Sequence, residues 1–124
     1  MSVITPAEAT VYHHADNRWH SFVSPRSGSD QLCAWRIDIP AGTRSTPHRV
    51  NREEVLYVLT GTLTVTLAGV TGTAEPGDAV FIPVDTLVRV DNLGDQPASA
   101  WVTTGTGFQG TFEDGTVFVP EWVQ

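Results

Sequence analysis

Short alternations of apolar and polar residues, separated by turns, run through most of this 124-residue chain. The clearest is at 33–39, where four apolar residues alternate with one small and two charged ones. The apolar residues are Cys33, Trp35, Ile37 and Ile39, and the others are Ala34, Arg36 and Asp38. A period of two is typical of a strand with one face turned inward. We expect further strands at 19–23, 54–59, 62–67, 79–82, 87–90, 98–103 and 116–119, and one short helix from 5–8. Short strands divided by turns favour a β-sandwich or barrel, so the chain is predicted to be all-β with little helix.

Two turn glycines, Gly42 and Gly61, enclose a histidine and a glutamate, His48 and Glu54. Residues two apart in a strand face the same side, so His48 shares its face with Val50. The strand that follows brings Glu54 back beside them. A later segment has Gly77, with Pro83 six residues further on and Asn92 nine residues after that. These two segments, 42–61 and 77–92, are the most informative in the chain.

Both segments resemble the two motifs of the cupin family. The match includes the glycines, the first histidine, the glutamate, the proline and the asparagine. The family's other two histidines are replaced by Val50 and Val88, and its second glycine in the later motif by Asp85. The resemblance implies a cupin-type double-stranded β-helix, or jelly-roll barrel. It also implies that His48 and Glu54 lie within a few ångström of each other inside that barrel.

One cupin-like domain is expected over 1–124, with an N-terminal arm and first strand in 1–30. This length suits one domain, and a 40% hydrophobic composition with four tryptophans can fill its core. The predicted ligand site is the barrel interior. His48 and Glu54 are the candidate catalytic residues, and the pocket is expected to be lined by Val50, Val88, Trp35, Leu56 and Val58.

An apolar cavity lowers the pKa of a histidine, whereas a nearby carboxylate raises it. Such a pair titrates near neutral pH, where acid–base catalysis is most effective. We therefore expect a metabolic enzyme of isomerase, cyclase or dehydratase type, with His48 as acid or base and Glu54 orienting it. An equally open alternative is a pocket that binds a ligand without chemistry, as a sensor or accessory protein does.

A further alternative is a metal-dependent cupin oxygenase or isomerase. Its ligands would be His48 and Glu54, and its metal iron, manganese, zinc, nickel or copper. Because valines replace two of the family's four ligands, we expect no tightly bound metal and no other cofactor. Conceivable substitute ligands are Asp85, Cys33, His13, His14 and His20, although none has a spacing that predicts this role.

The net charge of −7, with seven scattered arginines and no lysine, disfavours nucleic acids and anionic membranes as partners. The single cysteine permits no internal disulfide, and the N-terminus does not resemble a signal peptide. A cytoplasmic protein is expected. The apolar C-terminal run at 116–123 should be held against its own barrel or a neighbouring chain. A homodimer is the expected assembly, both by the cupin resemblance and because two-fold dimers are the commonest soluble oligomers.

Overall fold

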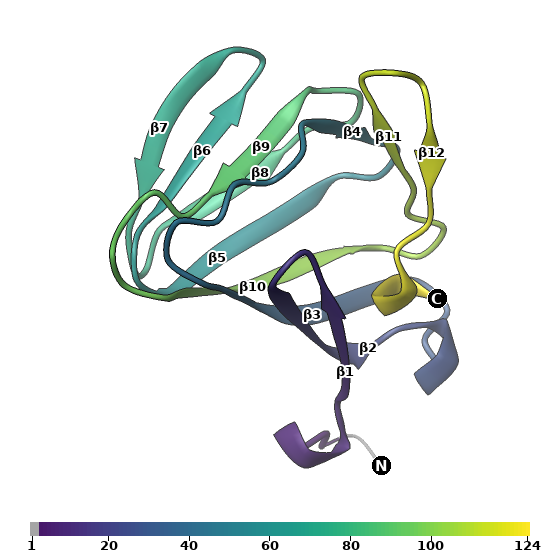
Figure 1. Cartoon of the computed structure of the whole chain (residues 1–124). Helices are drawn as coiled ribbons and strands as arrows, with labels where there is room; N and C mark the ends of the chain where they lie inside the picture. Colours follow the sequence, from purple (N-terminus) through teal and green to yellow (C-terminus); the bar gives the residue numbers. More distant parts are fainter. Residues whose placement is uncertain (1–2) are drawn as a thin grey trace.

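The computed structural model describes residues 3–124, which form two six-stranded antiparallel sheets that face each other (Figure 1). The first sheet contains, in order, β1 (Thr10–His14), β2 (Asn17–Val23), β3 (Leu32–Ile39), β10 (Ala98–Gly105), β5 (Glu54–Thr60) and β8 (Ala79–Ile82). The second contains β12 (Val117–Phe118), β11 (Gly110–Phe112), β4 (His48–Val50), β9 (Val88–Asp91), β6 (Leu63–Leu67) and β7 (Val70–Ala74). The predicted all-β jelly-roll class is confirmed.

Each predicted strand corresponds to an observed one, whereas β1, β7 and β11 were not predicted. Four of the five residues of β7 are exposed, so it has no buried face to produce an apolar alternation. β11 has only three residues and begins with a glycine. Residues 3–30 contain two strands, β1 and β2, where one was expected. The helix expected at 5–8 is a single 3-10 turn, η1 (Pro6–Glu8), and two similar turns are η2 (Pro25–Ser27) and η3 (Glu121–Val123).

The turn at Gly61 needs a glycine for two separate reasons. Its φ of 73° lies in the left-handed region, which side chains disfavour. A Cβ atom there would also lie 2.6 Å from the Pro97 carbonyl oxygen and 2.8 Å from the Ala98 Cα.

Asp85, at the position where cupins have their second glycine, adopts a left-handed φ of 59°. The backbone shape of that motif is thus retained without its glycine, since aspartate tolerates this region better than most residues.

The core lies between the two sheets and is built from the inward residues of their strands. On β5, buried Glu54, Leu56 and Val58 alternate with exposed Val55 and Tyr57. The inward direction that parity predicts for this strand is therefore confirmed. Trp35, Val50 and Val88 also belong to the buried cluster.

The C-terminal run is held against its own chain, which is one of the two arrangements expected. β12 pairs with β11, and the Trp122 ring of η3 stacks on Trp19 of β2 at a centroid distance of 4.1 Å. The Trp122 carbonyl oxygen also accepts a hydrogen bond from the Ser21 hydroxyl at 3.0 Å. Between residues 3 and 124, no helix has the length and apolar composition needed to cross a membrane.

Candidate functional site

His48 lies on β4 in the second sheet, directly opposite Val88 of β9 and Phe112 of β11. Its Nδ1 is 3.0 Å from the Thr46 carbonyl oxygen. Because a carbonyl oxygen only accepts, Nδ1 carries the proton and the neutral ring keeps a lone pair on Nε2. Burial lowers the pKa of His48 below its usual value, and the bond to Thr46 opposes this effect only in part. The imidazole is therefore neutral at neutral pH.

Glu54 begins β5 in the first sheet, opposite Ile82 of β8 and Thr104 of β10. The residue is only 8% exposed. Within residues 3–124, no hydrogen bond or ion pair reaches its carboxyl group. Burial alone raises its pKa from 4.5 to about 8, because a charged carboxylate is poorly solvated there. Glu54 therefore keeps its proton at neutral pH.

His48 and Glu54 thus come from opposite sheets, and no hydrogen bond joins them in the described part of the chain. The sequence predicted two opposing effects on the pKa of His48: the apolar cavity would lower it and a neighbouring carboxylate would raise it. Burial does lower the pKa, whereas Glu54 is not among the causes of the shift, so the raising effect is not found. The structure therefore has two neutral titratable groups where a histidine oriented by a carboxylate was expected.

The five residues predicted to line the pocket are all buried: Trp35, Val50, Leu56, Val58 and Val88. Aromatic side chains cover the His48 side of this interior. Phe118 of β12 packs edge-on against the His48 ring at a centroid distance of 5.7 Å and stacks on Phe112 at 4.4 Å. The Phe118 ring occupies the space that a side chain at Gly110 would need. The β11–β12 hairpin therefore borders the His48 side chain.

Two surface pockets of about 340 and 330 Å³ lie elsewhere. The first is apolar and lies between the outer edges of the two sheets, with Val70 and Phe81 among its lining residues. The second adjoins the N-terminal arm and includes Tyr12 and Arg26. Neither is lined by His48 or Glu54.

The donor set at the cupin motif positions does not fit a tightly held metal. Across residues 3–124, no three His, Cys, Asp or Glu side chains come together as a metal-binding group. The substitutes considered from sequence lie elsewhere: Cys33 contacts the Val123 carbonyl oxygen, His20 contacts Asp38, and His13, His14 and Asp85 are exposed. Two protein ligands leave most of the coordination sphere of a transition metal unfilled.

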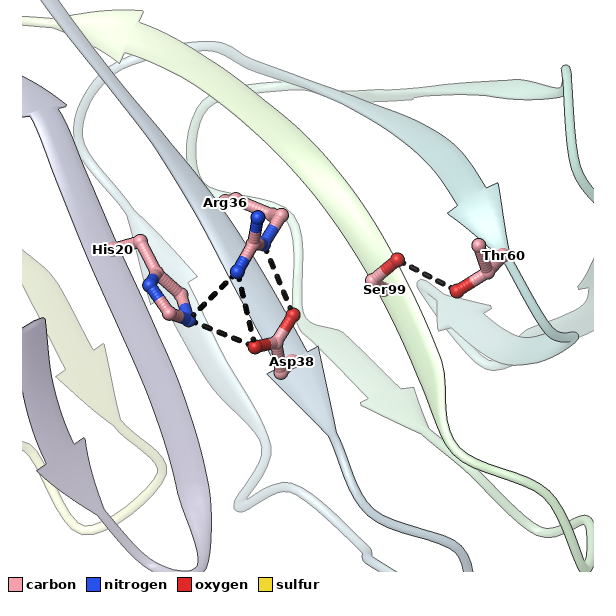
Figure 2. Close-up of polar contacts among 5 residues, drawn as sticks. All are labelled: His20, Arg36, Asp38, Thr60 and Ser99. Carbon is pink, nitrogen blue, oxygen red and sulfur yellow. Dashed lines mark hydrogen bonds and ion pairs between the residues drawn. The ribbon is translucent and has the colours of Figure 1, made fainter. Parts of the chain in front are cut away.

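Two polar clusters were missed from sequence. Asp91 is fully buried; its Oδ1 accepts from the Ser45 backbone N–H at 2.8 Å and its Oδ2 from the Arg89 Nε at 2.7 Å. The other cluster joins His20, Arg36 and Asp38 on the outward face of the first sheet (Figure 2). A signal for the latter was present, since Arg36 and Asp38 take the non-apolar positions of the 33–39 alternation.

Neighbouring Asn92, which matched the later motif, has a structural role. Its Nδ2 donates to the carbonyl oxygens of Ile39 and Gln96, and its Oδ1 accepts from the Gly94 N–H. These bonds fix the loop between β9 and β10 and tie it to the end of β3. All three are made within the chain, so Asn92 has a structural role.

Two facing antiparallel sheets, with a motif histidine and glutamate at their inward positions, define a small β-barrel of the cupin type. The cupin-domain family model matches residues 35–104, more than half of the chain, so this protein belongs to the cupin family. No curated protein matches the sequence significantly.

Solved structures with the same fold share little sequence with this chain. The polyketide cyclase RemF from Streptomyces resistomycificus is 20% identical with a TM-score of 0.75, over 98% of this chain and 88% of that one. KdgF from Halomonas sp. is 20% identical with a TM-score of 0.74, over 85% and 93%. A putative sugar phosphate isomerase from Acidithiobacillus ferrooxidans is 22% identical with a TM-score of 0.70, over 90% and 81%. These similarities establish the fold.

Proposed function

We propose that this cupin binds a small hydrophobic molecule in its barrel interior and catalyses proton transfer on it. Isomerisation, cyclisation and dehydration are reactions of this type. The observation that carries the proposal is the Glu54 carboxyl group: the residue is only 8% exposed, its pKa is raised to about 8, and the group has no cation or hydrogen-bond donor among residues 3–124. Burying such a group costs stability, and strongly perturbed titratable groups concentrate at functional sites.

The protonation states give the two residues opposite roles. Glu54 is the general acid because it holds a proton at neutral pH, with a pKa raised to about 8. His48 is the general base, because its pKa is lowered and its Nε2 has a free lone pair. Nε2 takes a proton from a substrate carbon while Glu54 gives its proton to a substrate oxygen. The reverse transfers, through product or water, restore both groups, so no co-reactant is consumed. The orienting role expected for Glu54 is thereby replaced by a direct one.

The aliphatic surroundings set the class of substrate. Val50 and Val88 stand where cupins with complete motifs have histidines, and both are buried. Apolar walls with a few convergent polar groups favour a hydrophobic molecule with one or two oxygens. Phe118 of the β11–β12 hairpin packs edge-on against His48 and would therefore border the bound molecule.

Two structural relatives are consistent with such chemistry. RemF is described as a polyketide cyclase and the Acidithiobacillus protein as a putative sugar phosphate isomerase. Both reaction types rearrange one molecule without transferring a group from another. At 20% and 22% identity these proteins support the fold directly and the reaction class only by analogy.

The test follows solvent deuterium, so it does not require the product to be known. The protein is incubated in D₂O with a panel of hydrophobic ketones and aldehydes, and deuterium uptake beside the carbonyl is followed by NMR. We expect uptake into at least one compound, reduced about 100-fold or more by His48→Asn and by Glu54→Gln. His13→Asn and Glu53→Gln, which change exposed residues, are the matched controls. Uptake at the wild-type rate in both interior variants would refute the assigned roles.

Two other outcomes identify the alternatives. A panel compound that raises the melting temperature without deuterium uptake indicates a non-catalytic binding protein. Elemental analysis of protein purified without added metal tests the metal-dependent alternative. One iron, manganese, zinc, nickel or copper ion per chain, lost in His48→Asn but retained in His13→Asn, would replace the metal-free mechanism.

A further inference from the structure

The apolar pocket of about 340 Å³ lies where both sheets end, with β7 as the last strand of the second sheet and β8 as the last strand of the first. We call it the edge groove. Its volume is within the range of small-molecule sites. No charged residue is among those that line it. The lining residues that matter below are Val65, Leu67, Gly72 and Val80.

The edge groove is reached from the inward faces of the strands around it. Gly72 of β7 pairs with Val65 of β6, which belongs to the buried core. Val80 of β8 pairs with Leu56 of β5, and Leu56 follows Glu54 by two residues on the same buried face. Cross-strand partners share one face of a sheet. The groove is therefore the part of the barrel interior that reaches the surface between β7 and β8.

A row of paired residues leads from the edge groove to His48. Leu67 of β6 lines the groove and pairs with Val88 of β9, and Val88 pairs with His48 of β4. Two strand spacings separate Leu67 from His48, a distance of about 10 Å. Leu67 is half-buried, whereas Val88 is only 2% exposed. An apolar chain that starts beside His48 and follows this row therefore ends in the groove.

Gly72 stands in the middle of β7, although nothing within the described chain requires a glycine there. Its φ lies outside the left-handed region, and an added Cβ atom would meet no other atom of residues 3–124 within 4 Å. A glycine weakens the interior of a strand, and it often marks a place where a ligand approaches closely. Because Gly72 pairs with inward Val65, the side chain that it lacks would project into the edge groove.

We propose that the edge groove holds the apolar chain of the molecule whose oxygen lies between His48 and Glu54, and that Gly72 leaves the room for this chain. The ligand class is then a carbonyl compound with an uncharged alkyl chain several carbons long, because a charge would be poorly solvated against these walls. The inference rests on the proposed function for the position of the oxygen. The role of the groove can nevertheless be tested by binding alone.

The test compares two ketones that differ only in chain length, methyl butyl ketone and methyl octyl ketone, by NMR titration of the full chain. Each methylene group that enters the edge groove should strengthen binding about fourfold. Gly72→Leu fills the groove, so it should raise the dissociation constant of methyl octyl ketone about tenfold or more, and that of methyl butyl ketone less than about twofold. The variant should remain folded, since the added side chain enters open space.

Gly94→Leu is the matched control. Gly94 lies in the loop between β9 and β10, outside the lining of the edge groove. Its φ is not left-handed, and the nearest atom to an added Cβ is the Asn92 Oδ1 at 3.5 Å. We expect both dissociation constants to match the wild type. No binding of methyl octyl ketone to the wild type, or an equal constant in Gly72→Leu, would overturn the inference.

The edge groove and the proposed catalysis fail in different ways. Binding of methyl octyl ketone that depends on Gly72, without deuterium uptake in D₂O, would refute the proton transfer and support the groove. Deuterium uptake with binding unaffected by Gly72→Leu would support the catalysis and overturn the groove. Native mass spectrometry covers the remaining occupant: an assembly of the wild-type chain that Gly72→Leu dissociates would assign the groove to a second copy and overturn the inference.

Discussion

The His48 imidazole and the Glu54 carboxyl group occupy opposite sheets of one barrel and are not hydrogen-bonded to each other. His48 is paired across its strand with Val88, and Glu54 with Ile82. Each polar group therefore lies beside an aliphatic residue of the neighbouring strand, and burial shifts both pKa values so that the neutral form is favoured. The interior combines a proton donor and a proton acceptor without a net charge.

The variant Glu54→Gln should become more stable relative to wild type as the pH rises. The pKa of Glu54 is 4.5 unfolded and about 8 folded. Between these values the folded protein binds the extra proton, so its free energy of unfolding falls by up to about 1.4 kcal/mol per pH unit. The glutamine amide of the variant does not titrate. Urea denaturation from pH 5 to 9 measures the free energy of unfolding of both proteins. The advantage of Glu54→Gln over wild type should grow up to about pH 8 and then level off. Glu53→Gln is the control, and a difference independent of pH would contradict the burial effect.

Shortening the aromatic cover should expose His48. Phe118→Ala removes the ring that packs on His48 and stacks on Phe112. We expect diethyl pyrocarbonate to modify His48 several-fold faster, with a stability loss of about 1–3 kcal/mol, because the ring is only partly buried. Peptide mass spectrometry gives the modification rate. Phe22→Ala, on the outward face, should leave this rate unchanged. An equal rate in Phe118→Ala would show that the hairpin does not shield the site.

Two turn glycines with the same φ separate backbone strain from crowding. Gly42 and Gly61 both have a φ of 73°, but a Cβ atom added at Gly42 would meet no other atom within 4 Å, whereas one at Gly61 would meet Pro97 and Ala98. Gly42→Ala should cost about 1–2 kcal/mol from the left-handed conformation alone. Gly61→Ala should cost about 1–3 kcal/mol more, because the backbone must shift. Chemical denaturation measures both values, and equal costs would show that the Gly61 turn relaxes freely.

The buried carboxylate of Asp91 should be important for stability. It accepts hydrogen bonds from Ser45 and Arg89 and is fully buried. Asp91→Asn turns one acceptor oxygen into a donor and leaves the Arg89 guanidinium without its anion, at a cost of about 3–5 kcal/mol. The exposed Asp95→Asn is the control. A loss below about 1 kcal/mol in thermal unfolding would mean that the ion pair adds little.

Much of the fold could be predicted from the sequence, because apolar and polar residues alternate along a strand that has one buried face and one exposed face. The alternations at 33–39 and 62–67 appear as β3 and β6. β7 could not be read this way, since four of its five residues are exposed and no apolar period arises. The left-handed backbone at Asp85 could not be predicted either. Glycine is the residue that usually indicates such a turn, and here an aspartate adopts the same conformation.

The burial of the residues around the predicted site could be inferred from the sequence, but the electrostatics of the site could not. Parity placed Val50 and Leu56 in the interior, where they are buried. The pKa of Glu54 depends on which groups surround the carboxyl in space, and a single sequence does not contain that information. The same limit applies to Phe118, which approaches His48 from 70 residues further along the chain.

The most direct test of the central claim is an infrared titration of the Glu54 carboxyl group. Protonated carboxylic acids have a carbonyl stretching band that carboxylates lack, and the wild-type spectrum minus that of Glu54→Gln isolates this residue. We predict that the band is present at pH 7 and disappears with a midpoint near pH 8. A midpoint near the ordinary value of 4.5 would mean that the interior holds a solvated carboxylate, and the proposed general acid would not exist.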